Sequence, residues 1–150
     1  MTTEGARPSL HALLAHVPLV VWGASFVFDC ASYFGGAPFV EAALFNVAAG
    51  LVAMLAVAVG EARDYVARLP PASSARRIAR WQALANLAAT ALFAASLWLR
   101  WPARGAAETP RAPFVLSALG VAVLAVASYL GGLVEYAYAA TTRRQSPGGG

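Results

Sequence analysis

Residues 112–134 read APFVLSALGVAVLAVASYLGGLV, a stretch between Arg111 and Glu135 that carries no formal charge. An α-helix rises about 1.5 Å per residue, so about 20 apolar residues cross the hydrocarbon core of a bilayer. This stretch is therefore predicted to be a membrane-spanning helix. Charge-free stretches of similar length also occur at 8–28, 42–60 and 81–99.

The composition also indicates a membrane protein. The chain is 59% hydrophobic and 12% charged, whereas a soluble domain is about 25% charged. We predict an all-α integral membrane protein, a four-helix bundle in up-down-up-down order, with spans at about 10–33, 38–60, 80–99 and 113–138. A short segment (1–9) precedes this transmembrane domain (10–140), and a flexible C-terminal tail (141–150) follows it.

The connections between the predicted spans differ in length and composition. The first contains two glycines that end one helix and Pro38 that opens the next, so the first two spans form an antiparallel hairpin. The second, at 61–80, is predicted to extend the second helix, to break at Pro70 and Pro71, and to restart near Ser74. The third contains three prolines and is predicted to be irregular.

Arginine is distributed unequally between the two ends of the predicted bundle. Because cytoplasmic segments of membrane proteins carry an excess of basic residues, we predict that both termini are cytoplasmic. The side with both termini carries eight: Arg7, Arg63, Arg68, Arg76, Arg77, Arg80, Arg143 and Arg144. The opposite side carries three: Arg100, Arg104 and Arg111.

Two charged residues and two amides fall within or at the ends of the spans. Asp29 lies in the last turns of the first span, where the helix dipole disfavours a carboxylate, and Arg100 ends the third span on the same membrane side. We predict that Asp29 and Arg100 form a structural ion pair that ties the two hairpins together, in preference to a transport or proton-relay role. Asn46 and Asn86 lie deeper and are predicted to hydrogen-bond across helices.

The two histidines, His11 and His16, lie at the start of the first span. On one helix they differ by about 7.5 Å in height and roughly 140° in direction, so they cannot be opposite axial ligands of one haem. A haem with a non-histidine ligand, or one shared across an oligomer, stays open. A tight zinc site needs three or four ligands, and Cys30 lies at the other membrane face.

Polar residues gather in the predicted cytoplasmic half of the bundle, where Gly131 and Gly132 leave room beside the backbone. They would form a pocket for a quinone head group, a lipid head or a metal. The alternative, which we favour, is a hydrogen-bonded interfacial cluster without a ligand. This predicted polar cluster consists of His11, His16, Gln82, Asn86, Glu135 and Tyr136.

The second connection is basic. Its arginines would bind anionic lipid at about 1 kcal/mol each, or would simply set the topology. They are Arg63, Arg68, Arg76, Arg77 and Arg80. The chain has no phosphate-loop, dinucleotide-binding, CxxC or HExxH motif, so we expect no catalytic site and no metal centre. We expect no nucleic acid binding either, because these arginines are those of a membrane protein's inner face.

Several motifs together resemble a bacterial family of small inner-membrane proteins, the domain of unknown function numbered twenty-two thirty-one. HALLAHVP at 11–18 is similar to that family's HPxxxHFP-type opening, and SYLGGLVEY at 128–136 is similar to its GYLGGxLVY element. Asp29, Gly60 with Asp64, and Arg100 follow in the expected order. The resemblance implies a four-helix membrane bundle in the bacterial inner membrane and no settled activity.

This chain departs from the family pattern at two positions. Members often carry a further histidine early in the third span, where this chain has Gln82, and a proline where it has Ala12. We therefore expect a structural or accessory subunit of a larger membrane assembly, in contact with lipid and with other subunits or further copies of itself. The alternative is a haem-, metal- or quinone-binding redox protein that uses His11 and His16.

Overall fold

The computed structural model describes residues 10–68 and 74–145, with side chains described at 16–60, 62–63, 74–134 and 136. Within these ranges the chain forms four helices and no strand: α1 (Leu10–Gly35), α2 (Ala37–Arg68), α3 (Ser74–Arg100) and α4 (Arg111–Gln145). The predicted all-α class is confirmed.

Each helix is long and apolar enough to cross a membrane. Candidate spans among the described residues are His16–Gly35, Ala37–Gly60, Ser74–Arg100 and Arg111–Val134. Two helices extend beyond the predicted spans. The extension of α2 to Arg68 and the start of α3 at Ser74 agree with the predicted second connection, whereas α4 reaches Gln145, inside the segment expected to be a flexible tail. Neither extension contains Gly or Pro, so nothing in the local sequence ends these helices earlier. The predicted break at 70–71 and the segments 1–9 and 146–150 lie outside the described residues.

The turn between α1 and α2 depends on one glycine. Gly36 has φ of +78°, and its N–H donates to the carbonyl of Ser32 at 3.0 Å, which caps the end of α1. Pro38 follows in the first turn of α2, where its missing N–H removes no helical hydrogen bond. The predicted glycine end and proline start of the first hairpin are confirmed.

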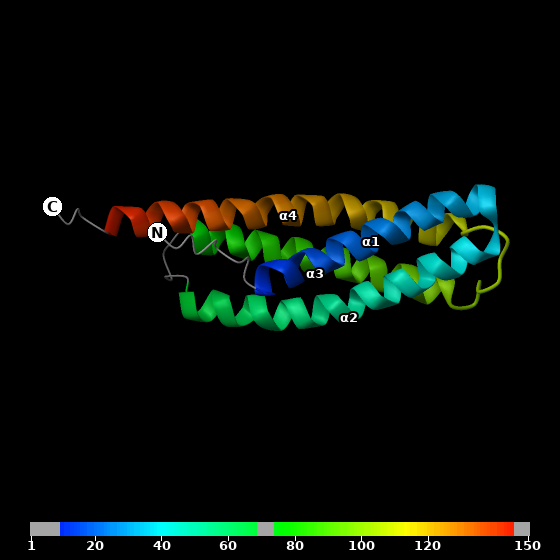
Figure 1. Ribbon diagram of the computed structural model, residues 1–150, viewed down its shortest axis with the longest axis horizontal. Helices are drawn as coiled ribbons and strands as arrows, with labels where there is room; N and C mark the ends of the chain where they lie inside the picture. Colours follow the sequence, from blue (N-terminus) through cyan, green and yellow to red (C-terminus); the bar gives the residue numbers. More distant parts are fainter. Residues whose placement is uncertain (1–9, 69–73, 146–150) are drawn as a thin grey trace, which may run out of the picture.

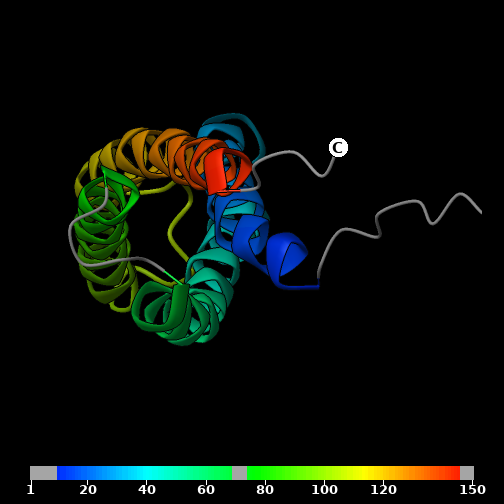
Figure 2. The same cartoon turned by 90° about the vertical axis from the view of Figure 1, so that its left-hand side faces the viewer.

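The four helices lie side by side and alternate in direction (Figure 1). The α1–α2 turn and the α3–α4 loop lie at the same end of the bundle, which we call the turn end (residues 33–38 and 101–110). In the view along the bundle, α1 and α3 each lie between α2 and α4 (Figure 2). Contact is most extensive within each hairpin, between α1 and α2 and between α3 and α4. The hairpins are therefore the packing units, and other contacts must join them.

A stack of two aromatic rings joins the hairpins in the bundle centre. Trp22 of α1 and Phe93 of α3 are fully buried, with ring centroids 4.2 Å apart. Trp22 lies against Gly50 of α2 and donates its Nε1–H to the carbonyl of Val47 at 3.2 Å. Phe93 lies against Gly120 of α4. Each helix thus contributes to the stack, and the two glycines make room for the rings.

Gly50→Ala is expected to lower the free energy of unfolding by about 1–3 kcal/mol, because the added methyl overlaps the indole of Trp22. Gly23→Ala in α1 is the matched control. Nothing lies within 4 Å of a Cβ built at Gly23, so the same change there should leave stability unchanged or raise it. Thermal unfolding of the two variants in one detergent compares them, and equal midpoints would contradict this packing.

Candidate functional site

A buried ion pair joins the two hairpins near the turn end. Asp29 lies in the last two turns of α1, and Arg100 is the last residue of α3. Arg100 Nη1 donates to Asp29 Oδ1 and Nη2 donates to Asp29 Oδ2, each at 2.6 Å. The two side chains are 1% and 0% exposed. This is the bidentate geometry in which a guanidinium and a carboxylate match best.

Two serines accept two further hydrogen bonds from Arg100. Its Nε donates to Ser96 Oγ at 3.1 Å, and its Nη2 also donates to Ser117 Oγ at 2.9 Å. Ser96 Oγ lies 3.1 Å from Ser117 Oγ and donates to the carbonyl of Pro113 at 3.0 Å. Because Ser117 and Pro113 belong to α4, the guanidinium is held by three helices.

Thr109 fastens the α3–α4 loop to α1. Its Oγ1 donates to Asp29 Oδ1 at 3.0 Å, and its backbone N–H donates to Ser32 Oγ at 3.0 Å. Its carbonyl accepts a hydrogen bond from Tyr33 OH at 2.9 Å. Ser32 Oγ in turn donates to the carbonyl of Asp29 at 2.7 Å. Thr109 is 1% exposed, so this loop residue is part of the core.

Thr109→Val keeps the shape of the side chain and removes its hydrogen bond to a buried carboxylate. We expect the free energy of unfolding to fall by about 1.5–3 kcal/mol, the usual range for hydrogen bonds to charged groups. Thr90→Val is the matched control, since Thr90 Oγ1 bonds only the Asn86 carbonyl of its own helix, at 2.7 Å. If detergent-denaturation curves show the same loss of unfolding free energy for the two variants, the bond from Thr109 to Asp29 stabilises the protein no more than a hydroxyl bond within one helix.

Each polar group of the network has a partner inside the protein. In the part of the chain whose side chains are described, no buried side-chain nitrogen or oxygen lacks a hydrogen bond. A buried charge is tolerated only when it is paired and hydrogen-bonded. Arg100 also lies at the C-terminus of α3, where the helix dipole favours a cation. These contacts offset the unfavourable position of Asp29 near the C-terminus of α1.

The hydroxyl groups of this network were not singled out from the sequence. A spacing signal existed for two of them, because Ser32 and Ser96 lie one helical turn from Asp29 and Arg100 respectively. Ser117 and Thr109 carry no comparable signal. They reach the ion pair only because α4 and the loop pack there.

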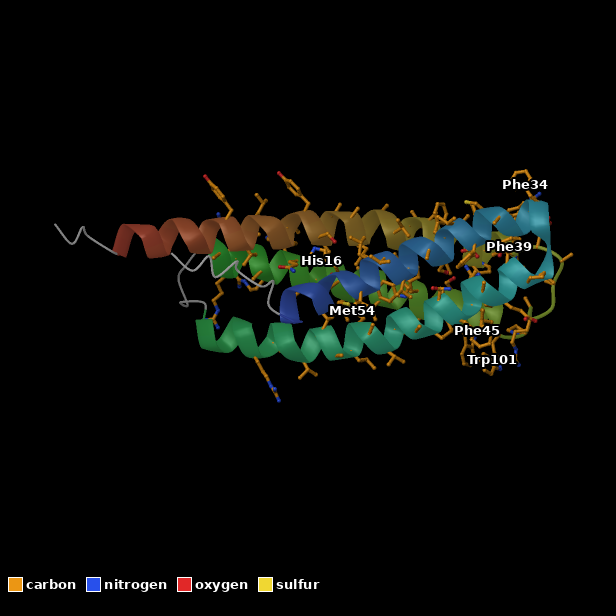
Figure 3. All side chains as sticks on the ribbon, viewed as in Figure 1. His16, Phe34, Phe39, Phe45, Met54 and Trp101 are labelled. Carbon is orange, nitrogen blue, oxygen red and sulfur yellow. The ribbon has the colours of Figure 1, made fainter. Side chains whose placement is uncertain are left out.

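The members of the predicted polar cluster lie on three helices, away from the turn end. His16 is exposed on α1, in the part of the helix away from the turn end (Figure 3). Tyr136 is exposed on α4, whereas Asn86 of α3 is buried. The structure describes His11 and Glu135 as parts of α1 and α4 but does not describe their side chains. Among the side chains that are described, no group of three His, Cys, Asp or Glu could hold a metal ion.

The two further amide side chains lie in different surroundings. The amide of Gln82 lies beside Gly131, where a Cβ would come 3.0 Å from Nε2, whereas nothing lies within 4 Å of a Cβ built at Gly132. Asn46 Nδ2 donates to the carbonyl of Ala42 at 2.8 Å, one turn back in its own helix. The expected cross-helix bond of Asn46 is wrong, since the local carbonyl satisfies the donor.

The described parts of the predicted basic connection, 61–68 and 74–80, lie at the end of the bundle opposite the turn end (Figure 1). Arg63 of α2 is exposed, as are Arg77 and Arg80 of α3. Arg76 is half-buried, and the side chain of Arg68 lies outside the described residues.

Four apolar helices of membrane length, joined through a buried Asp–Arg pair, define a multi-pass α-helical membrane protein. The chain matches the family described as "Predicted membrane protein (DUF2231)" over residues 7–144, and it belongs to that family. The resemblance seen in the sequence is thereby confirmed. Neither a curated protein nor a solved structure gives a significant match.

Proposed function

We propose that this protein is a non-enzymatic structural or accessory subunit of a larger assembly in the bacterial inner membrane. The observation that carries the proposal is the Asp29–Arg100 network. Its polar groups come from both hairpins and from the α3–α4 loop, and they hydrogen-bond to one another. Polar groups at membrane depth are expensive, and buried pairs of this kind fix one arrangement of helices. The network thus serves to hold the bundle in shape, as a scaffold requires.

The outer surface supports contact with lipid and with other subunits or a second copy. Large apolar side chains are exposed on all four helices, for example Val20, Val52, Leu87 and Val126. Within a bilayer such side chains contact lipid tails or neighbouring helices. The bundle therefore has apolar surface for partners on every side.

The proposal is tested by the size and composition of the protein as extracted from its native membrane into mild detergent. We expect it to migrate in a stoichiometric complex, with defined subunits or with further copies of itself. A stable, partner-free monomer would overturn the proposal.

An absorption spectrum and a metal analysis accompany the measurement. Stoichiometric haem, metal or quinone would instead favour a redox protein that uses His11 and His16.

The proposed orientation places both termini and the basic connection in the cytoplasm. Its support is the exposure of Arg63, Arg77 and Arg80 at the end opposite the turn end. Single cysteines at Arg77 and at the exposed Glu108 of the turn end, in a Cys30→Ser background, test it. A membrane-impermeant maleimide should label Glu108→Cys in intact cells and Arg77→Cys only after lysis. The reverse labelling would overturn this orientation.

A further inference from the structure

We propose that the turn end binds a zwitterionic aminophospholipid of the phosphatidylethanolamine type. One of its acyl chains would lie in an apolar groove between α2 and α3, and its head group between Glu41 and Arg104. Two adjoining surface cavities and their charges support this site.

The groove has a volume of about 560 Å³ and lies between α2 and α3 near the turn end. Its wall is apolar and includes Leu51 of α2, Ala94, Leu97 and Trp98 of α3, and Trp101 and Pro102 of the loop. A volume of several hundred Å³ with an apolar wall is typical of ligand-binding clefts. The indoles of Trp98 and Trp101 are exposed near the end of α3, and tryptophan is enriched where membrane helices meet lipid head groups.

A smaller cavity of about 140 Å³ carries the charges. Val40, Glu41, Leu44 and Phe45 of α2 line it on one side, and Arg104 of the loop lines it on the other. No salt bridge joins Glu41 to Arg104, although both side chains are described and both border the cavity. A carboxylate and a guanidinium therefore face one space without neutralising each other.

Trp101, which lines the groove, contacts Arg104, which lines the smaller cavity. The guanidinium carbon of Arg104 lies 3.8 Å from the centroid of the Trp101 ring, and Arg104 Nε donates to the Trp101 carbonyl at 2.9 Å. These contacts hold the exposed cation in place beside the groove that Trp101 also lines. Figure 3 labels Phe45 and Trp101, one from each cavity, at the turn end.

The arrangement of charges matches one class of head group. The Nη donors of Arg104, for which the described residues provide no hydrogen-bond acceptor, suit a phosphate, and Glu41 suits a primary ammonium group that donates hydrogen bonds. A glycerol head group offers Glu41 no cation, and its lipid adds a net negative charge beside a carboxylate. A choline head group has no N–H to donate. Selection for the primary amine thus follows from Glu41, and retention of any phospholipid follows from Arg104.

The site is tested by native mass spectrometry of the full-length protein. The protein is presented with equimolar phosphatidylethanolamine, phosphatidylglycerol and phosphatidylcholine of identical acyl chains. We expect phosphatidylethanolamine to be retained in preference, and Arg104→Gln to lower its apparent affinity about tenfold. Glu41→Gln should remove the preference over phosphatidylglycerol. The exposed charges Glu108 and Arg111 line neither cavity, so Glu108→Gln and Arg111→Gln are the matched controls and should change nothing.

Filling the groove provides a second test that leaves both charges in place. Ala94 and Ala95 are both exposed on α3, but only Ala94 lines the groove. Ala94→Phe should lower phosphatidylethanolamine retention severalfold, and Ala95→Phe should not. Equal retention of the three lipids, a preference for phosphatidylglycerol, or no effect of Arg104→Gln would overturn the proposal. A dimer that Ala94→Phe dissociates would also overturn it, since a second copy would then occupy the groove.

Discussion

Arg100→Met is expected to lower the free energy of unfolding by about 3–5 kcal/mol, the usual effect of removing one partner of a buried ion pair. The substitution keeps much of the side-chain volume but leaves the carboxylate of Asp29 without its cation. Asp29 is 0% exposed, so water cannot replace the guanidinium. Unfolding in mixed micelles of increasing SDS content, followed by circular dichroism, measures the loss.

Two further variants separate the charge effect from a packing effect. Arg111→Met removes an exposed arginine at the first residue of α4 and should change stability by less than about 0.5 kcal/mol. Asp29→Leu combined with Arg100→Met removes both charges and should recover much of the loss, because an apolar pair leaves no buried ion behind. If the double variant is no more stable than Arg100→Met alone, the unpaired carboxylate is not the cause.

Phe93→Ala is expected to have a similarly large effect, about 3–5 kcal/mol, because it removes a fully buried ring from the contact between the hairpins. The loss exposes one face of Trp22 to a cavity and removes the contact with Gly120. Phe34→Ala is the matched control, since Phe34 is 94% exposed at the turn end (Figure 3).

Tryptophan fluorescence gives an additional signal for the Phe93 variant. Trp22 lies against the Phe93 ring, so its emission should change in Phe93→Ala even under native conditions. Unchanged emission together with unchanged stability would contradict the stacked geometry.

The sequence predicts most of the fold because membrane crossing depends on length and apolarity alone. The four charge-free stretches correspond to the four helices, and Gly36 with Pro38 specifies the first turn. The same reasoning brings Asp29 and Arg100 together, since an ionisable residue in this position needs a counter-ion from the same membrane depth.

Other features depend on packing that a linear pattern does not contain. Trp22 and Phe93 are two among many apolar residues, and only the helix positions make them meet between Gly50 and Gly120. Thr109 lies in a proline-rich connection that predicts only an irregular loop, yet the residue is buried and bonds to Asp29 and Ser32. The outer end of α4 also extends further than hydropathy indicates, because helix formation does not stop where the apolar stretch stops.

The position of the counter-ion has a consequence for biogenesis. Asp29 and Arg100 are 71 residues apart in the chain, and residues 8–62 contain no lysine or arginine. The first hairpin therefore leaves the ribosome with an acidic group that nothing in its own apolar segments neutralises. Its completion waits for the second hairpin to insert beside it. A nascent chain that is truncated before Arg100 would thus keep an unpaired Asp29 carboxylate, and we expect insertion chaperones and membrane proteases to recognise it.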